Sequence, residues 1–211
     1  PAEAGKHAEK YADAESEGKR LIAEGKVAAF TVAGGQGTRL GFEGPKGMFM
    51  ATHSGKSLFQ VFAEQLSKAQ EKYNCRIPWY IMTSPMNDSQ TRAFFAENTY
   101  FGLEPSDVMF FPQGTLPSIG LDGKLLLSSK CDLALNADGH GGSLRALRRS
   151  GALADMKKRG VEYLSYIQVD NPNVKMIDPL FIGLHAQSKS EMSAKMLPKT
   201  HAKEKVGNFC L

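Results

Sequence analysis

The chain has 211 residues, which at ~150 residues per domain predicts one domain, or one domain with part of a second. Hydrophobic residues make up 42% of the chain and charged residues 23%, as in folded globular proteins and unlike disordered or fibrous chains. A net charge of +4 is too small over this length to indicate nucleic-acid binding. No apolar run approaches the ~18 residues of a membrane span and no signal peptide opens the sequence, so we expect a soluble, cytoplasmic protein without membrane or nucleic-acid partners.

The cysteines do not form a metal-binding or disulfide pattern. Cys75, Cys131 and Cys210 include no CxxC pair, which disfavours a structural zinc site, and their odd number disfavours a disulfide framework. We therefore expect reduced thiols packed within the fold.

The two ends of the chain differ from its middle. Residues 1–25 are rich in Ala, Glu and Lys, which predicts a solvated helix, in one or two pieces, that ends near Gly25. We expect this segment to be a helical appendage to a main domain over residues 26–211. The chain opens on Pro1 rather than Met, and residues 206–211 are typical of an interrupted strand, so we expect only the N-terminal part of that domain.

From Lys26 onward, strand signals alternate with helix signals. Short apolar runs bounded by turn residues predict buried strands over residues 27–33, 77–83, 107–112 and 161–170. The connections between them are long enough to cross over a sheet, so the expected fold is α/β, with a mostly parallel sheet covered by helices on both faces.

Helical spacing of apolar residues fills the gaps between these strands. Helices are predicted from residue 58, from residue 87 and over residues 143–158. Ser57 and Gln60 form a capping box at the first helix, and Gly151 breaks the last one. Asp122-Gly123 lies in a stretch of weak periodicity and predicts a hairpin turn.

Glycines and polar residues follow all four predicted strands. They are residues 34–39, 83–84, 113–114 and 170–171. Ligands of parallel α/β sheets bind beyond the carboxyl ends of the strands, so we expect these residues to form a binding site.

The glycine loop after the first strand is the most informative segment. Residues 32–41 read VAGGQGTRLG, and residues 44–47 read GPKG. Glycines let backbone N–H groups approach phosphate oxygens and tolerate positive φ. Arg39 and Lys46 add two cations, one a planar fork and one a mobile point charge. This combination predicts a site for a polyphosphate.

Two common phosphate-binding motifs are excluded by spacing. Gly35, Gly37 and Gly41 have one residue too many for the dinucleotide fingerprint G-x-G-x-x-G, which disfavours a dehydrogenase. Residues 55–57 resemble the end of a Walker A motif, but that motif needs a glycine five positions before Gly55, where Met50 stands.

Residues 32–41 with 44–47 resemble the signature of the UDP-sugar pyrophosphorylases, and within them the UDP-N-acetylglucosamine pyrophosphorylases. The resemblance starts near residue 26 and continues in the family's order at residues 78–84, 100–102, 110–114, 116–117, 138–139, 141–142, 169–171 and 178–179. It implies a Rossmann-like, GT-A-like nucleotidyltransferase fold, with residues 26–211 as the N-terminal part of the catalytic domain.

The resemblance also implies roles for individual residues. Those that wrap the nucleotide phosphates and sugar are Val32, Ala33, Gly34 and Gly35, with Arg39 further along. Lys46 matches a lysine that neutralises the phosphate at the reacting centre. Gln113 holds the place of a glutamine that reads uracil, whose edge an amide can match with one donor and one acceptor. Gly139 is expected close to the base or ribose, and Asp170 resembles a metal-binding carboxylate, which implies Mg²⁺.

One position departs from the family pattern. Many eukaryotic members have Asn after Asp-Gly, whereas this chain has His140, which can also bond a sugar hydroxyl but is bulkier and titratable. The implied reaction is Mg²⁺-dependent formation of UDP-N-acetylglucosamine and pyrophosphate from UTP and N-acetylglucosamine 1-phosphate. Two alternatives remain: a pyrophosphorylase for a broader range of UDP-sugars, including UDP-glucose and UDP-galactose, and a module that binds UDP-sugar without turnover.

Overall fold

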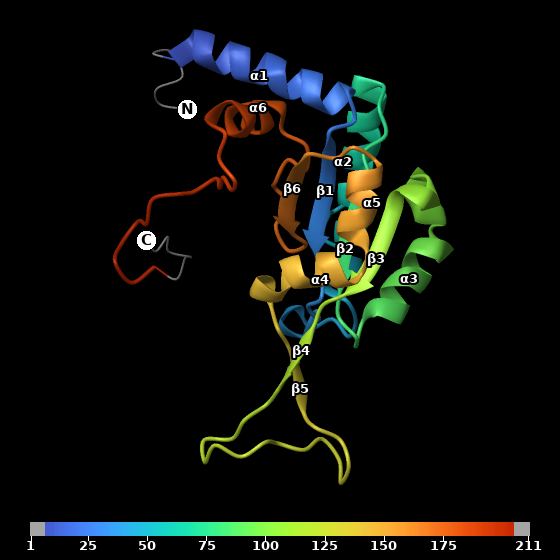
Figure 1. Cartoon of the computed structure of the whole chain (residues 1–211). Helices are drawn as coiled ribbons and strands as arrows, with labels where there is room; N and C mark the ends of the chain where they lie inside the picture. The colour runs from blue at the N-terminus through green and yellow to red at the C-terminus, as the bar shows by residue number, and fades with distance from the viewer. Residues whose placement is uncertain (1–6, 205–211) are drawn as a thin grey trace.

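Four parallel strands form the sheet of the computed structural model, which describes residues 7–204 (Figure 1). The strands, in their order across the sheet, are β3 (Val108–Pro112), β2 (Trp79–Thr83), β1 (Val27–Val32) and β6 (Tyr163–Gln168). Every neighbouring pair is parallel, so all four carboxyl ends lie at one edge, the lower one in Figure 1. The predicted α/β class and the parallel sheet are confirmed.

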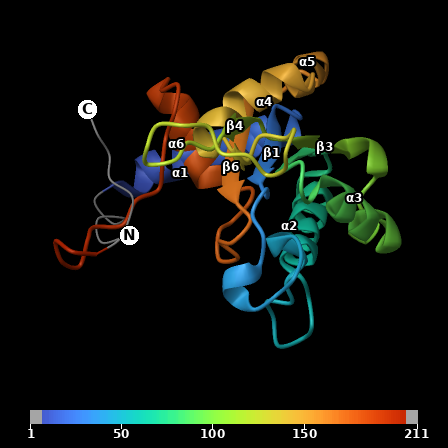
Figure 2. The ribbon, with the colours of Figure 1, turned by 90° about the horizontal axis from the view of Figure 1, so that it is seen from below.

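Helices cover both faces of this sheet, as predicted. On one face lie α2 (Leu58–Tyr73) and α3 (Asp88–Glu97), and on the other lie α4 (Ser143–Arg149) and α5 (Ala152–Lys158) (Figure 2). The alternation of strand side chains divides the core accordingly. In β1, Val27 and Ala29 pack toward α2, whereas Ala28 and Phe30 pack toward α4 and α5.

The local signals at the helix ends are mostly confirmed. Ser57 Oγ accepts a hydrogen bond from the backbone N–H of Gln60 at 3.1 Å, as an N-cap does. The side-chain amide of Gln60 donates to Glu64 one turn further on, so only one half of the predicted capping box forms. Gly151 has φ +83° and separates α4 from α5, as predicted.

Helix α1 (Ala8–Ala23) packs closely on α6 (Pro179–Ser188), a helix that was not predicted from the sequence. Two glycines allow this contact. A Cβ atom on Gly18 would lie 1.8 Å from the carbonyl oxygen of Pro179, and one on Gly183 would lie 1.6 Å from that of Ala14. The predicted N-terminal helix is confirmed over its described residues, and the proposed domain boundary at residue 25 stays a prediction.

A two-stranded arm extends from the lower end of the sheet (Figure 1). Strands β4 (Thr115–Pro117) and β5 (Leu135–Ala137) pair antiparallel, and the predicted Asp122-Gly123 turn lies between them. Gly123 has φ +78° and donates its N–H to the carbonyl of Gly120 at 2.9 Å. The hairpin signal is therefore confirmed.

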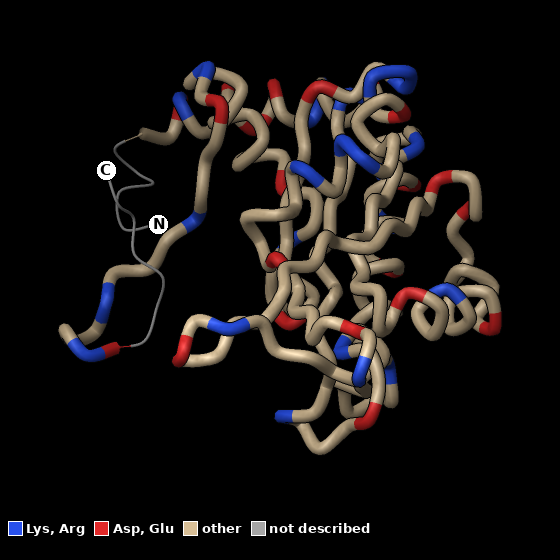
Figure 3. The backbone as a smooth tube through the Cα atoms, turned by 60° about the horizontal axis from the view of Figure 1, so that its bottom comes forward, with Lys and Arg blue, Asp and Glu red and all other residues tan. Residues whose placement is uncertain are grey.

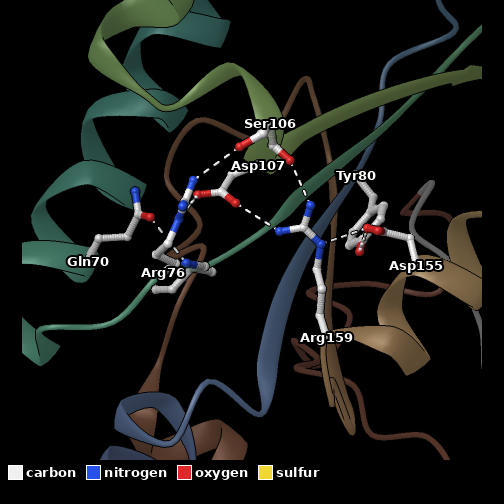
Figure 4. A network of polar contacts seen from close by, with 8 residues as sticks. Gln70, Arg76, Tyr80, Ser106, Asp107, Asp155 and Arg159 are labelled. Atoms are coloured by element: carbon white, nitrogen blue, oxygen red, sulfur yellow. Dashed lines mark hydrogen bonds and ion pairs between the residues drawn. The ribbon is translucent and has the colours of Figure 1, made fainter.

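A network of polar side chains connects β2, β3 and α5 (Figure 4). Asp107, only 6% exposed, accepts hydrogen bonds from Arg76 at 2.6 Å and Arg159 at 2.8 Å. Asp155 accepts from Arg159 at 2.8 Å and from the Tyr80 hydroxyl at 2.7 Å. We call these five residues the charge network. Burial alone would raise the pKa of Asp155, but the bonds from Tyr80 and Arg159 outweigh it and hold the pKa below its usual value.

The single tryptophan of the chain lies at the centre of the core. Trp79 is 1% exposed, and its indole N–H donates to Thr31 Oγ1 of the neighbouring strand at 2.8 Å. The rings of Phe59 and Phe95 meet it edge-on, with centroids 6.3 and 5.5 Å away. The indole thus reports on the contact between β2 and the two helices on this face.

The remaining expectations concern charge, membranes and thiols. Lys and Arg are distributed among Asp and Glu over the molecule (Figure 3). No helix within residues 7–204 is both long and apolar enough to cross a bilayer.

The cysteines only partly match the prediction of packed thiols. Cys75 is half-buried, and burial raises the pKa of its thiol. Cys131 is exposed on the arm, so the prediction of a packed thiol is wrong there. Cys210 and the strand expected at residues 206–211 lie outside the described residues.

Candidate functional site

A cavity of about 210 Å³ lies at the carboxyl ends of the strands, the end that faces the viewer in Figure 2. Its lining residues are Val32, Gly34, Gly35, Lys46, Met82, Gln113, Ala137, Gly139, His140, Gln168, Val169 and Asp170. Eight of the ten site residues predicted from sequence are among them. The structure therefore brings together residues that are spread over more than half of the chain.

A larger cavity of about 710 Å³ lies along β6 and α6. It shares only Gln168 with the smaller cavity, and of the residues expected at the strand ends only Asn171 lines it. The smaller cavity is the candidate site because it contains the glycine loop and the charged pair described below.

A buried asparagine fixes the glycine loop through hydrogen bonds to its backbone carbonyls. Asn87 is fully buried, and its side-chain amide donates to the carbonyls of Ala33 at 3.0 Å and Gly35 at 3.4 Å. The backbone N–H groups of Gly34 and Gly35 have no hydrogen-bond partner within residues 7–204. With the carbonyls occupied and the N–H groups free, the loop is suited to an anion.

Gln113 lies against this loop at the end of β3. Its backbone N–H donates to the carbonyl of Thr83 at 2.9 Å, and the residue is 8% exposed. A Cβ atom on Gly34 would lie 2.6 Å from the side-chain nitrogen of Gln113. Gly34 is therefore required for the amide to reach the cavity beside the loop, which the sequence pattern alone did not show.

An ion pair spans the cavity between Lys46 and Asp170. Lys46 Nζ lies 2.8 Å from Asp170 Oδ2, and the lysine side chain is 14% exposed against 47% for the aspartate. The hydrogen bond from Lys46 holds the pKa of Asp170 below its usual value. The positive charge is thus fixed within the cavity, while the carboxylate also faces solvent.

His140 and Gly139 come from the chain that returns from the arm. Gly139 has φ +66°, a conformation that favours glycine, and His140 begins a short 3-10 helix, η6 (His140–Gly142). His140 Nδ1 forms a hydrogen bond with the hydroxyl of Tyr166 on β6. Tyr166 carries no signal in the sequence, because it lies 26 positions from His140 and in a different element.

Two predicted residues do not line the cavity. Ala33 is fully buried in the core, and its N–H donates to the carbonyl of Met82. Arg39 is exposed on the 3-10 helix η2 (Thr38–Leu40). Their roles toward a ligand stay predictions, as do those of the residues that do line it.

Several residues around the site were missed from sequence. They are Met82, Ala137, Gln168 and Val169 in the lining and Asn87 behind the loop. Gln168 is the last residue of β6, at the strand end beyond which a ligand was expected, so its position could have indicated it. Asn87 supports the glycine loop because the loop after β2 lies beside the loop after β1, and no pattern in the sequence indicates that contact.

Asp170 is the residue of the cavity best suited to a metal ion. Within residues 7–204 no group of three or more His, Cys, Asp or Glu side chains is arranged to hold a cation. Mg²⁺ is commonly held by one or two carboxylates together with phosphate oxygens and water. A single half-exposed carboxylate beside a glycine loop with free N–H groups fits that pattern.

Comparison with known proteins places the chain in a family. The model of the family described as UTP–glucose-1-phosphate uridylyltransferase matches residues 2–211. The chain belongs to this family. This confirms the resemblance to the UDP-sugar pyrophosphorylases, and among them to those for UDP-N-acetylglucosamine. It also confirms the nucleotidyltransferase fold.

Members of the family with known names include close relatives. The chain is 44% identical over 203 residues to UDP-N-acetylhexosamine pyrophosphorylase-like protein 1 of Xenopus tropicalis, covering 93% of this chain and 40% of that protein. It is 42% identical over 204 residues to UDP-N-acetylglucosamine diphosphorylase 2 of Arabidopsis thaliana, covering 91% and 41%. The chain therefore spans about two fifths of the length of these relatives.

A solved structure of the family superimposes over nearly the whole chain. It is the uridine diphosphate N-acetylglucosamine pyrophosphorylase of Trypanosoma brucei, in complex with an inhibitor, with a TM-score of 0.90 and 31% identity. The match covers 97% of this chain and 43% of that one.

Proposed function

We propose that this chain carries the nucleotide-binding site of a uridylyltransferase that forms UDP-N-acetylglucosamine and pyrophosphate from UTP and N-acetylglucosamine 1-phosphate. The observation that carries the proposal is the single cavity that unites the glycine loop, the Gln113 amide and the Lys46–Asp170 pair. Relatives named as UDP-N-acetylglucosamine diphosphorylases at 42% identity support this choice of sugar.

The loop and the amide would recognise the nucleotide. The free N–H groups of Gly34 and Gly35 would donate to phosphate oxygens, an arrangement that glycine permits because no side chain intervenes. The side-chain amide of Gln113 would donate to a carbonyl of uracil and accept from its ring N–H. Val32 and Gly139, which line the cavity, would shape its walls around the nucleotide, and Ala33 would support the loop from the core.

Lys46 would neutralise charge at the reacting phosphate. A phosphate oxygen of the sugar 1-phosphate attacks the α-phosphorus of UTP, the bond to the β-phosphate oxygen breaks, and pyrophosphate leaves in line. Such a transfer depends on positioning and charge stabilisation more than on covalent help from the protein. Arg39 would add a second cation from outside the cavity.

Asp170 would hold a Mg²⁺ ion together with phosphate oxygens of the substrate. The ion would supply charge neutralisation at the phosphates and orient them. The half-exposed carboxylate provides the ligand, and Lys46, now paired with it, would turn toward the phosphate.

A broader sugar range is the second candidate. The family's description names glucose 1-phosphate, and His140, where the resemblance to the family implies an asparagine, lines the cavity. A larger, titratable side chain there could change which sugar is accepted.

The rate of pyrophosphate release distinguishes the enzyme specific for the acetylated sugar from the enzyme with a broader sugar range. The protein as its gene encodes it would be given UTP and Mg²⁺ with N-acetylglucosamine 1-phosphate and, in parallel, glucose 1-phosphate. A strong preference for the acetylated sugar is expected. Comparable rates would favour the broader enzyme, and a UTP-induced rise in melting temperature without pyrophosphate release from either sugar would indicate binding without turnover.

A further inference from the structure

Tyr166 links the sheet to the histidine of the cavity. Its hydroxyl bonds to Nδ1 of His140, and the two ring centroids are 6.1 Å apart. In the strand register Tyr166 stands opposite Phe30 of β1, whose ring meets it edge-on at 5.3 Å between centroids. The aromatic core therefore holds the tyrosine ring while its hydroxyl reaches the site.

The chemistry of the two groups sets the direction of this bond. A phenol is a stronger donor than acceptor, and an unprotonated imidazole nitrogen is a strong acceptor. Burial raises the pKa of the Tyr166 phenol, so its proton stays on the oxygen near neutral pH. Because a neutral imidazole carries one proton, Nδ1 can accept only when the proton is on Nε2.

The other ring nitrogen is left for a ligand. Nε2 of His140 has no hydrogen-bond partner within residues 7–204, and His140 lines the cavity. In the proposed function, Gln113 takes the base, while the glycine loop and Lys46 take the phosphates. The imidazole of His140 and the amide of Gln168 are then the polar side chains of the cavity left for the sugar.

We propose that Tyr166 is a positioning residue, which fixes the ring and tautomer of His140 so that Nε2–H donates to an acceptor oxygen of the bound sugar, a ring hydroxyl or an acyl carbonyl. The assignment to the sugar rests on the proposed function. The fixing of the tautomer does not, since it follows from contacts within this chain alone.

The tautomer can be measured without turnover. In the protein as its gene encodes it, labelled with ¹⁵N-histidine, the chemical shifts of the ring nitrogens distinguish protonated from unprotonated atoms, and the signal of His140 is identified by its loss in His140→Asn. The wild-type protein should show unprotonated Nδ1 and protonated Nε2. Tyr166→Phe, which keeps the ring on Phe30, should move both shifts toward a tautomer mixture.

Kinetics then test the role toward the sugar. Loss of one hydrogen bond predicts a roughly threefold to tenfold rise in the KM for the sugar 1-phosphate in Tyr166→Phe, with the KM for UTP unchanged. In a His140→Asn background the same substitution should have no further effect, since the two residues act as one unit.

Tyr163→Phe is the matched control. Tyr163 lies on the same strand, but its ring meets His185 and it does not line the candidate site. This substitution should change neither the His140 shifts nor either KM.

Three results would overturn parts of the inference. Unchanged His140 shifts in Tyr166→Phe would refute the fixing of the tautomer. A changed KM for UTP with an unchanged KM for the sugar would refute the assignment to the sugar. If the wild-type protein released no pyrophosphate with any sugar 1-phosphate, the proposed function and the assignment to the sugar would fail, and the ¹⁵N shifts would still decide whether Tyr166 fixes His140.

Discussion

The charge network and the Lys46–Asp170 pair contain ion pairs of similar length in very different settings. In the network, the carboxylate of Asp107 is 6% exposed and bonds two arginines at 2.6 and 2.8 Å. In the cavity, Asp170 is 47% exposed and bonds one lysine at 2.8 Å. The distances alone would not separate a structural pair from a functional one.

The number of partners and the exposure of the carboxylate make the difference. Asp107 has both oxygens occupied by protein groups, so its charge serves to connect the chain just before β3 with Arg76 before β2 and Arg159 at the end of α5. Asp170 keeps capacity for another ligand, and beside it lie the free N–H groups of the glycine loop. A pair with unused bonding capacity is suited to exchange partners when a substrate binds, whereas a saturated pair is suited to stability.

Substitution at Lys46 should have the largest effect. In Lys46→Ala, loss of the cation that neutralises the reacting phosphate predicts a roughly 100-fold to 1,000-fold fall in kcat, by analogy with the loss of one group that stabilises transition-state charge. The free energy of unfolding should change by less than about 1 kcal/mol because its partner is half-exposed. Pyrophosphate release and urea unfolding measure the two quantities.

Lys56→Ala is the control for this substitution. Lys56 also forms an ion pair, at 2.7 Å to Glu64 of α2, but neither residue lines the cavity. It should leave kcat unchanged. An unaltered kcat in Lys46→Ala would refute the assignment of the cavity.

Substitution in the network should show the reverse pattern. Arg159→Ala removes one of two partners from a buried carboxylate, which predicts a loss of about 2–3 kcal/mol in the free energy of unfolding. The affinity for UTP should not change. Lys158→Ala, at an exposed neighbouring residue on α5, is the control. Urea unfolding measures stability, and calorimetry measures UTP binding. A variant Arg159→Ala that bound UTP more weakly but unfolded like the wild type would contradict the structural role of the charge network.

Asp170→Asn tests whether the free capacity of the Asp170 carboxylate serves to bind Mg²⁺. An amide is a weaker ligand for Mg²⁺ than a carboxylate, so the Mg²⁺ concentration for half-maximal turnover should rise about tenfold. Asp13→Asn, on the exposed side of α1, should leave it unchanged. A Mg²⁺ titration of Asp170→Asn that coincides with the wild type would show that the metal ligand lies elsewhere.

The smallest expected effect is on the pH dependence of stability. The pKa of Asp155 is lowered in the folded state, so its contribution to stability is present above the usual pKa of ~3.9 and is lost as the pH falls through the lower folded value. Tyr80→Phe removes one cause of that shift. Between pH 5 and 3 the wild type should therefore lose more stability than the variant, by less than about 1 kcal/mol, and parallel curves in acid unfolding would contradict the assignment.

Much of the sheet and of the cavity could be predicted from the sequence because the signals are local. Apolar runs gave four strands, and parallel pairing then placed Gln113 and Asp170 at one edge with the glycine loop. The partner of Lys46 could not be predicted, since the loop has to fold back before its lysine meets a carboxylate 124 positions away.

Other features depend on how distant backbones meet. Helix α6 has apolar residues around its whole circumference, so no helical stripe marked it, and it packs on α1 through the bare backbone at Gly18 and Gly183. The charge network depends on the register of β2 and β3, which apolar alternation does not specify. The bond between His140 and Tyr166 likewise follows from the position of β6 beside β1.

The buried indole of Trp79 offers an optical probe of this chain. With one tryptophan in 211 residues, its fluorescence arises from one known place, between β2 and the aromatic rings of α2 and α3. Its emission should shift to longer wavelength when that packing opens to water and stay constant when only the cavity is altered. A single emission spectrum would thus separate variants that damage the scaffold from those that damage the site.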